Sequence, residues 1–338
     1  MEALSADTIP QGAQWQYEPK WDGFRCVAFR DGKNIFLQSK AGQPLGRYFP
    51  EITGSLGALA PERFVLDGEI VIAIGDTLSF NDLLMRIHPA ESRIRKLSAL
   101  HPATYVLFDL LLDENGPLLM QPLAKRRQAL EQFARNYLQH QERLRLSPKT
   151  DRFQEAMRWF KKMAGGLDGV IAKRLDAPYE RGERSGAVQK IKNLRTADCV
   201  VGGFRYAQKK QDGARVVGSL LLGLYNDRGL LDHVGFTSAI SRGERAALTR
   251  KLEKLVEPPG FTGSAPGGPS RWSTKRSMEW SPLKPSLVVE VRYDHFSGGR
   301  FRHGTQLVRW RPDKAPRQCR ASQVVHESKS PLSLLDAR

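Results

Sequence analysis

The sequence predicts an α+β protein of two domains, the first built on antiparallel sheets with flanking helices and the second a small β-barrel. At 338 residues, the chain exceeds the roughly 250–300 residues that a single core usually reaches. Short apolar or alternating runs, broken by Gly and Pro, predict many strands. The pattern changes near residue 195. We therefore expect domains at residues 1–195 and 196–322, followed by a tail over 323–338.

Strands dominate the first half of the first domain. From residue 17 to about 74, short apolar runs are separated by the expected turns Asp31-Gly32, Ala41-Gly42 and Asp67-Gly68. The run 64–74 is expected to be a pair of strands broken at Asp67-Gly68. A buried strand should follow over 105–112.

Helices and lysine-bearing strands complete that domain. Apolar residues recur at helical spacing over 130–138 and again over 153–160. The runs 169–174 and 188–192 read as strands, and the alternation of side chains places Lys190 and Lys192 on one face.

The second domain should be a barrel of the OB type. Its expected strands are separated by one helix, which starts at a capping box of Ser241 and Glu244 and runs to about Val256. The runs that predict these strands are 199–204, 216–225, 229–236, 287–293 and 306–311.

The charge balance predicts a polyanionic partner. The chain has 53 Lys and Arg against 36 Asp and Glu, so its net charge is +17, a value that favours nucleic acid. No membrane partner is expected, because no basic amphipathic helix, lipidation signal or long apolar run accompanies the charge. Three distant cysteines, Cys26, Cys199 and Cys319, and a start without an export signal predict reduced thiols in a cytoplasmic protein.

The segment Glu18-Pro-Lys-Trp-Asp-Gly-Phe-Arg25 contains a candidate nucleophile, Lys20. A lysine amine with its ordinary pKa near 10 is mostly protonated, so catalytic use requires burial, a cationic neighbour, a carboxylate or a metal. Asp22 could orient the amine, and Gly23 would let a ligand approach the backbone closely. Taken alone, this pattern is more typical of a strand with a solvated end.

Further strand ends carry reactive or charged residues in a fixed order. They are Ser39-Lys40-Ala41-Gly42, Asp67-Gly68-Glu69, Phe108-Asp109, Asp168-Gly169-Val170 with Lys173, Lys190-x-Lys192, and Arg309-Trp-Arg-Pro-Asp-Lys314. With Lys20, this ordered set resembles the covalent nucleotidyltransferases, and most closely the ATP-dependent DNA ligases. The resemblance covers essentially the whole chain and is strongest to the small stand-alone two-domain bacterial ligases of end joining and repair. It implies an ATP-grasp-like adenylation domain followed by an OB fold.

The resemblance also implies a mechanism. Lys20 would attack the α-phosphorus of ATP to give lysyl-AMP, the AMP would pass to a DNA 5′-phosphate, and a 3′-hydroxyl would then displace it. Asp22, Lys190 and Lys192 would assist catalysis, the two lysines by stabilising developing negative charge. Glu69 and Asp168 would hold Mg²⁺ or Mn²⁺. The residues implied to bind the nucleotide are Glu18, Lys20, Arg25, Glu69, Phe108, Lys173, Lys190, Lys192, Arg311 and Lys314.

DNA contacts are implied for another set of basic residues. These are Arg25, Lys40, Arg205, Lys209 and Lys210, with Lys40 at the 5′-phosphate of the break. The commoner family pattern has Glu where Asp168 stands, so direct metal binding by Asp168 is in question. It also has Arg where Lys40 stands; lysine keeps the charge but loses the two-pronged contact with phosphate.

Simpler roles stay open for single residues. Phe108 could pack in the core, the lysine pair could be a solvated strand face, and Asp67 and Asp109 could brace the fold. The basic run 125–127 could be helix surface, a structural anchor or a DNA contact.

Alternatives also stay open for the whole protein, namely an RNA ligase, a capping-type guanylyltransferase or a non-catalytic DNA-binding relative. The expected partners are duplex DNA with a nick, gap or end, and a Ku-like end-binding protein or a repair polymerase. We expect a monomer associated with the bacterial nucleoid.

Overall fold

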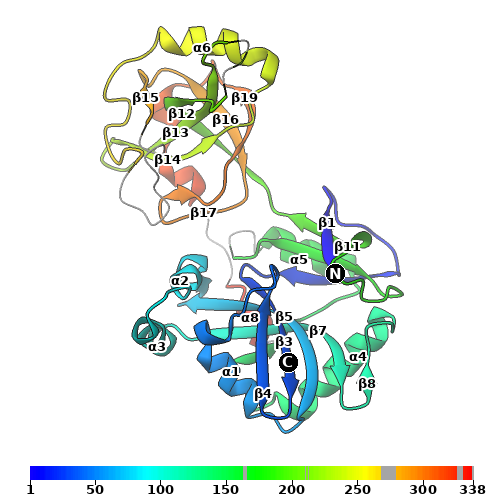
Figure 1. Ribbon diagram of the computed structural model, residues 1–338. Helices are drawn as coiled ribbons and strands as arrows, with labels where there is room; N and C mark the ends of the chain where they lie inside the picture. Colours follow the sequence, from blue (N-terminus) through cyan, green and yellow to red (C-terminus); the bar gives the residue numbers. More distant parts are fainter. Residues whose placement is uncertain (163–165, 210, 212, 268–278, 326–329, 337–338) are drawn as a thin grey trace. The chain divides into compact units, whose positions relative to one another are not determined.

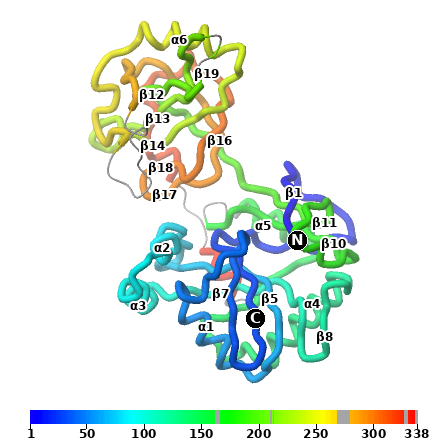
Figure 2. Tube along the Cα trace, in the orientation of Figure 1, coloured from blue at the N-terminus to red at the C-terminus, as the bar shows by residue number. Residues whose placement is uncertain are grey.

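The computed structural model describes residues 1–162, 166–209, 211, 213–267, 279–325 and 330–336. Its contacts divide the chain into two compact units, Met1–Asn193 with Ser328–Arg338, and Leu194–Glu327. The chain can be followed by colour through both units in Figures 1 and 2. None of the described helices has the length and apolar character needed to span a bilayer.

The larger sheet of the first unit is centred on β5 (Arg63–Ile74). This strand lies between β3 (Phe24–Asp31) and β7 (Ala103–Asp113), antiparallel to both. The turn expected at Asp31-Gly32 is confirmed, because Gly32 has φ +59° and joins β3 to the next strand. The other strands of the sheet are β4 (Asn34–Ser39), β6 (Thr77–Leu78), β8 (Gly116–Pro117) and β9 (Leu144–Leu146).

The expected break of the run 64–74 into two strands is wrong. The run forms the continuous strand β5, with only a shift of register beside Asp67 and Gly68 where it pairs with β7. A Cβ atom on Gly68 would lie 2.5 Å from the ring of Tyr105 and 2.6 Å from the carbonyl oxygen of Val106. Gly68 is therefore needed for close approach of two strands and does not mark a turn.

Helices cover one face of this sheet, and the charged side chains of β5 lie on the other face. The expected helix over 130–138 is confirmed within α4 (Leu123–Tyr137), which buries Leu130 and Phe133. Side chains alternate along β5, so Leu66 and Ile70 pack in the core under the helices while Asp67 and Glu69 point to the opposite face. Three further helices were not expected: α1 (Pro50–Gly57), α2 (Phe80–Met85) and α3 (Glu91–Leu100).

A smaller sheet completes the first unit. Its order is β1 (Glu2–Ser5), β11 (Arg184–Lys192), β10 (Gly169–Arg174) and β2 (Trp15–Lys20), with β1 parallel to β11 and the other pairs antiparallel. The expected helix over 153–160 is confirmed as α5 (Phe153–Lys162), which packs against β2 and β10.

Two described segments of the expected tail over 323–338 pack against the cores of the protein. Val324 is buried in the core of the second unit, at the end of a 3₁₀ turn. The short helix α8 (Ser333–Asp336) belongs to the first unit, where Leu334 and Leu335 pack against core residues.

The second unit is the expected OB-type barrel. Its strands follow the order β14 (Leu231–Thr237), β13 (Val217–Tyr225), β12 (Arg195–Tyr206), β16 (Val288–Tyr293) and β19 (Gln306–Trp310), and β15 (Ser281–Pro282) also pairs with β12. A bridge between Thr237 and Thr305 connects the end of β14 to the start of β19 and closes the barrel. The short strands β17 (Phe296–Ser297) and β18 (Arg300–Phe301) form a separate hairpin.

One helix of the second unit starts differently from the sequence expectation. Ser241 makes no capping hydrogen bond through its side chain, and a 3₁₀ turn over Arg242–Glu244 precedes α6 (Arg245–Glu253). The remaining 3₁₀ turns are Gly46–Tyr48, Pro316–Gln318 and Ala321–Val324. All three cysteines are buried and unpaired, as expected.

Candidate active site

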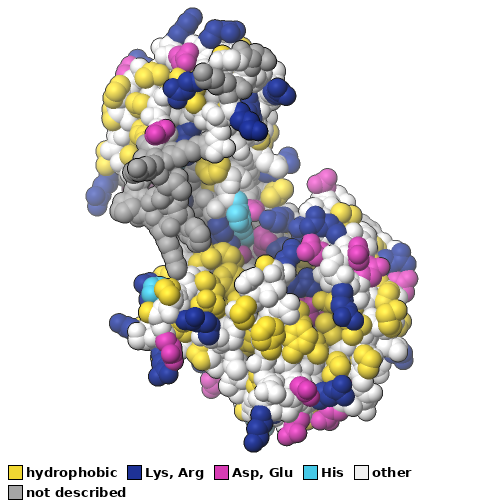
Figure 3. Space-filling view, in the orientation of Figure 1, with side chains coloured by type: hydrophobic (Ala, Val, Ile, Leu, Met, Phe, Trp, Pro, Cys, Tyr) yellow, Lys and Arg dark blue, Asp and Glu magenta, His cyan; other side chains and the backbone are white. Residues whose placement is uncertain are grey.

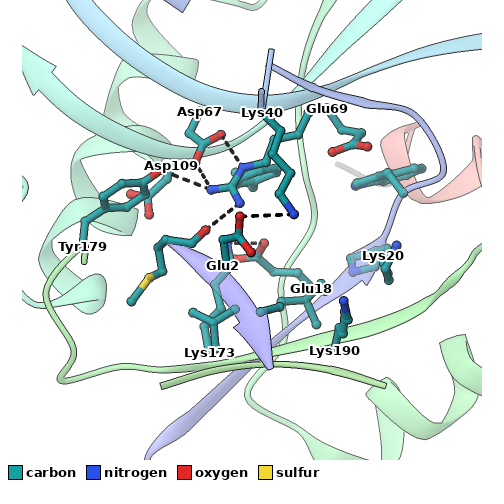
Figure 4. Close-up of a pocket in the computed structure, with 18 residues that line it drawn as sticks. Glu2, Glu18, Lys20, Lys40, Asp67, Glu69, Asp109, Lys173, Tyr179 and Lys190 are labelled. Atoms are coloured by element: carbon teal, nitrogen blue, oxygen red, sulfur yellow. Dashed lines mark hydrogen bonds and ion pairs between the residues drawn. The ribbon is translucent and has the colours of Figure 1, made fainter. Parts of the chain in front are cut away.

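A cavity of about 240 Å³ in the first unit collects the residues that the sequence singled out. Both sheets of this unit contribute side chains to its wall (Figure 4). The smaller sheet supplies Glu18, Lys20, Lys173 and Lys190, and the larger sheet supplies Arg25, Asp67, Glu69, Phe108 and Asp109. The fold therefore unites residues that lie up to 172 positions apart, the separation of Glu18 and Lys190.

Lys20 lies at the end of β2, where its ammonium group forms an ion pair with Asp168. Backbone pairing fixes this arrangement, since Lys20 lies opposite Gly169 and the amide of Asp168 donates to the carbonyl oxygen of Lys20 at 3.0 Å. Gly169 has φ +143°, and a Cβ atom there would lie 2.0 Å from the carbonyl oxygen of Ile191. Only glycine fits at this point. The pairing of Gly169 with Lys20 places Asp168, the residue before Gly169, beside Lys20.

Glu69 and Lys190 have shifted pKa values on this side of the cavity. Burial raises the pKa of Glu69 to about 8, although the positive charge of Lys20 acts in the opposite direction. The Glu69 carboxylate makes no hydrogen bond or ion pair within the described residues. Burial also lowers the pKa of Lys190, and the neighbouring charges of Lys20 and Lys192 add to this effect. Together these groups form a cationic site with an unpaired carboxyl group.

A second group of contacts surrounds Phe108. The ammonium nitrogen of Lys173 lies 4.5 Å from the centre of the Phe108 ring and 2.8 Å from a carboxylate oxygen of Glu18. Gln16 donates to the other oxygen of Glu18 at 2.7 Å. Glu18 and Lys173 are thus fixed by each other, next to an aromatic face in the cavity wall.

Asp67 and Tyr179 lie at the other end of the cavity (Figure 4), where they form a closed network with Arg25. Its guanidinium group donates to both carboxylate oxygens of Asp67, at 3.1 and 2.6 Å, and to the carbonyl oxygen of Met1 at 2.6 Å. The hydroxyl of Tyr179 donates to Asp67 at 2.7 Å. Arg25 and Tyr179 lower the pKa of the buried Asp67 carboxyl, although burial acts to raise it. Asp67 is therefore a brace for Arg25.

Asp109 and Arg126 form a buried pair behind this network. Arg126 donates to the two oxygens of Asp109 at 2.9 and 3.0 Å, and also to the carbonyl oxygen of Ala177 at 3.1 Å. Arg127 is equally buried and donates to the carbonyl oxygen of Ser147 at 2.7 Å. Of the roles left open by the sequence, bracing is confirmed for Asp109, and the structural anchor is confirmed for Arg126 and Arg127.

The late basic motif forms its own network in the second unit. Asp198 pairs with Arg311 at 2.8 Å and with Lys314 at 3.0 Å. Arg311 also contacts Asp313, and this hydrogen-bonded pair lowers the pKa of Asp313 to about 2. Both cations of the motif are therefore held by one carboxylate of the same unit.

Comparisons with known proteins agree with this geometry. The family model described as "ATP dependent DNA ligase domain" matches residues 4–192, and the one described as "ATP dependent DNA ligase C terminal region" matches residues 213–314. DNA ligase C2 of Mycolicibacterium smegmatis is 42% identical, over 96% of this chain and 93% of that protein. DNA ligase C of Mycobacterium tuberculosis is also 42% identical, over 96% and 92%.

The chain belongs to the ATP-dependent DNA ligases. A solved structure from a study of Lig E DNA ligases shares the fold. It has a TM-score of 0.55 at 16% identity and covers 92% of this chain and all of that one. The family uses ATP, so the cavity of this ligase is the candidate nucleotide-binding site.

Some expected site residues of this ligase lie outside the cavity wall. Lys192 lies opposite Gly169 in the sheet, and Asp22 follows the end of β2, but neither side chain lines the cavity. Arg205 lies in β12 and Lys209 is exposed just beyond it, both in the second unit. Lys210 lies outside the described residues.

Tyr179, Met1 and Glu2 are among the cavity residues that sequence reasoning missed. Tyr179 lies in a loop, and the residues around it in the sequence do not indicate that its hydroxyl contacts Asp67, 112 positions earlier. Met1 and Glu2 line the cavity because β1 pairs with β11. The alternation of polar and apolar residues in the first five positions is too short to predict a strand.

Proposed function

We propose that this protein is an ATP-dependent DNA ligase that seals breaks between a 3′-hydroxyl and a 5′-phosphate in duplex DNA through a lysyl-AMP intermediate. The observation that carries the proposal is Lys20, a lysine in the cavity wall paired with one carboxylate and close to a further cation, Lys190. The membership of the chain in the ligase family supports it. Residues 1–195 would act as the adenylation domain and residues 196–322 as the OB domain.

In the first step, the neutral amine of Lys20 attacks the α-phosphorus of ATP, and pyrophosphate leaves. Asp168 holds the ammonium group in position, and the amine proton must be lost before attack. Lys190 stabilises the negative charge that develops on the phosphate oxygens, and Lys192 adds positive charge from beyond the cavity wall. Asp22 would help to orient the Lys20 amine. Arg311 and Lys314 would orient the pyrophosphate after release from Asp198.

The other cavity residues would bind the nucleotide. Phe108 offers an aromatic face for adenine, and Glu18 and Lys173 lie beside it as hydrogen-bonding groups. Arg25, fixed by Asp67 and Tyr179, would contact the sugar or the DNA end.

The carboxylates present fit a divalent cation. Glu69 has no hydrogen-bond or ion-pair partner among the described residues, and burial raises its pKa to about 8, so a nearby cation would stabilise its charged form. No cluster of three or more ligands exists in the described part of the chain, and Mg²⁺ commonly uses one or two carboxylates together with substrate phosphates. Glu69 and Asp168 would hold Mg²⁺ or Mn²⁺, which would neutralise phosphate charge.

The DNA would be bound by Lys40 and Arg25 in the first unit and by Arg205, Lys209 and Lys210 in the second. These contacts go to phosphates and predict affinity that falls steeply with salt. Relatives include proteins named for multifunctional non-homologous end joining. Recruitment of this chain as a monomer by a Ku-like protein or a repair polymerase, at the bacterial nucleoid, is part of the same proposal.

The test uses radiolabelled ATP with the full chain, first stripped of bound AMP. The wild type should acquire a covalent label with Mg²⁺ and seal nicked DNA, whereas Lys20→Met should do neither. Lys33→Met, an exposed lysine in the turn after β3, is the matched control and should behave as the wild type. A wild type that neither takes label nor seals DNA would overturn the proposal.

The same assay separates the alternatives. Labelling by GTP in preference to ATP would indicate a guanylyltransferase, and preference for nicked RNA would indicate an RNA ligase. Nick binding without any labelling would indicate a non-catalytic relative.

A further inference from the structure

The last described segment of the chain packs on the first unit, although it follows the second unit in the sequence. The second unit spans Leu194–Glu327, and α8 lies beyond it among the elements of the first unit (Figure 1). Pro331 is buried, and Leu334 and Leu335 are partly buried against apolar core residues. The first unit is therefore completed by residues from the far end of the chain.

The buried apolar group on which α8 packs consists, among the described residues, of four side chains, which we call the apolar base. Each of them is at most 4% exposed. They are Trp21, Val71, Val106 and Leu167. Both leucines of α8 pack against this base, and Leu334 also contacts the core between the smaller sheet and α5. The helix thus joins two apolar groups of the first unit.

Two members of the apolar base flank the ion pair of the active site. Trp21 directly follows Lys20, and Leu167 directly precedes Asp168. Trp21 and Leu167 lie outside the strands, so pairing within a sheet does not hold them. The indole nitrogen of Trp21 donates to the hydroxyl of Ser147 at 2.9 Å, and the ring packs in the base. The position of the ion pair therefore depends on the packing around these two side chains.

The other two members of the apolar base are held by the larger sheet. Val71 lies two positions after Glu69 on β5, and Val106 lies directly opposite Glu69 on β7. Backbone hydrogen bonds between the paired strands hold both valines in place independently of α8. The contact with α8 should therefore matter most at the two members beside the nucleophile.

The covering of the base by α8 is selective. Figure 3 shows apolar side chains open to solvent on the first unit, and Phe29 and Phe36 are 37% and 47% exposed. The end of the chain leaves that surface open and covers the apolar group next to the reactive residues.

We propose that residues 330–336 are a positioning element of the active site, in which Leu334 and Leu335 hold the apolar base and thereby fix Lys20 and Asp168 for attack on the nucleotide. The inference rests on the proposed ligase function, and it adds the end of the chain to the residues on which the first step depends. Neither leucine lines the cavity, so both act through the base. A displacement of about 1 Å at a reacting group can slow a reaction about a hundredfold.

The test measures the single-turnover rate at which the full chain, first stripped of AMP, takes label from ATP at several ATP concentrations. Leu334→Asn combined with Leu335→Asn should lower the maximal rate about ten- to a hundredfold and leave the half-saturating ATP concentration within about threefold. Leu334→Met combined with Leu335→Met keeps the apolar contact and should stay within about threefold of the wild-type rate. Leu100→Asn, at an exposed leucine that ends α3, is the control and should stay within about twofold.

Hydrogen exchange of the same proteins gives a second readout. Peptides that contain Trp21 and Leu167 should exchange faster in the asparagine variant than in the wild type, whereas peptides of α4 should not. If the asparagine variant does not fold, Leu335→Ala takes its place and should lower the maximal rate about threefold or more.

The inference fails if the folded variant keeps the wild-type maximal rate, or if the methionine variant loses as much rate as the asparagine variant. Faster exchange throughout the first unit would show a general loosening of the fold and would also overturn it. A wild type that takes no label would instead overturn the proposed function, so the two failures are distinguishable.

Discussion

The two ends of the cavity differ in how completely their charges are paired. At one end, Arg25, Asp67 and Tyr179 satisfy one another, and Asp109 and Arg126 do the same behind them. At the other end, Glu69 has no described partner and the pKa of Lys190 is lowered, so charge is held there without full compensation. We propose that the first end maintains the shape of the cavity, whereas the second end is arranged for chemistry.

Removal of the buried cation at the braced end should have the largest effect on stability. Arg126→Met leaves the carboxylate of Asp109 buried without its partner, and we expect a loss of about 3–5 kcal/mol in the free energy of unfolding. Urea denaturation measures this loss. Arg135→Met, an exposed arginine in the same helix, should change stability by less than about 0.5 kcal/mol. If Arg126→Met also loses less than about 0.5 kcal/mol, the pair of Arg126 and Asp109 does not stabilise the fold.

Neutralisation of Glu69 should change how stability depends on pH. Its pKa is about 8 in the folded protein and near 4.5 in the unfolded chain, so the unfolded chain ionises first as the pH rises. Wild-type stability should therefore fall between these pH values, by at most about 1.4 kcal/mol per pH unit from this one group.

Glu69→Gln should lack that part of the slope and should gain stability relative to the wild type as the pH rises from 5 to 8. Urea unfolding of nucleotide-free protein at several pH values provides the measurement. Glu62→Gln, at an exposed position just before β5, should keep the wild-type slope. Equal slopes for all three proteins would show that Glu69 titrates normally and that the contrast between the two ends is overstated.

The smallest effect is expected from the hydroxyl that orients Asp67. Tyr179→Phe removes one hydrogen bond but leaves Arg25 paired with Asp67, so the loss of stability should be about 0.5–1.5 kcal/mol. Tyr137→Phe is the matched control, because its hydroxyl makes no hydrogen bond among the described residues. If the two variants lose the same stability, Tyr179 contributes only its ring to the brace.

The sequence predicted the elements that carry the reactive end well. Lys20, Lys173 and Lys190 lie on strands where the pattern placed them, because short runs with glycine boundaries have a clear local signature. Glu69 also lies on a strand, but the pattern had placed a turn directly before it. The helices α1 to α3 were missed because they are short and interrupt a region rich in strands. The local pattern also predicted a turn at Gly68. Glycine is needed there because the ring of Tyr105, on another strand, leaves no room for a side chain.

The partners at the braced end could not be predicted in the same way. For Arg126 the sequence left open a helix surface, a structural anchor and a DNA contact, and only the packed structure shows that it reaches Asp109 and Ala177. The contact of Glu2 with Lys40 joins two sheets, and the contact of Tyr179 with Asp67 spans 112 positions. Such pairings depend on the tertiary fold, and a single sequence carries no local signal for them.

The central claim is that covalent chemistry occurs at Lys20 and at no other lysine of the cavity. Peptide mass spectrometry of the intact chain after treatment with ATP and Mg²⁺ tests this most directly, because it identifies the modified residue without any substitution. The account predicts AMP on Lys20 alone. AMP on Lys40, Lys173 or Lys190, with Lys20 unmodified, would contradict it.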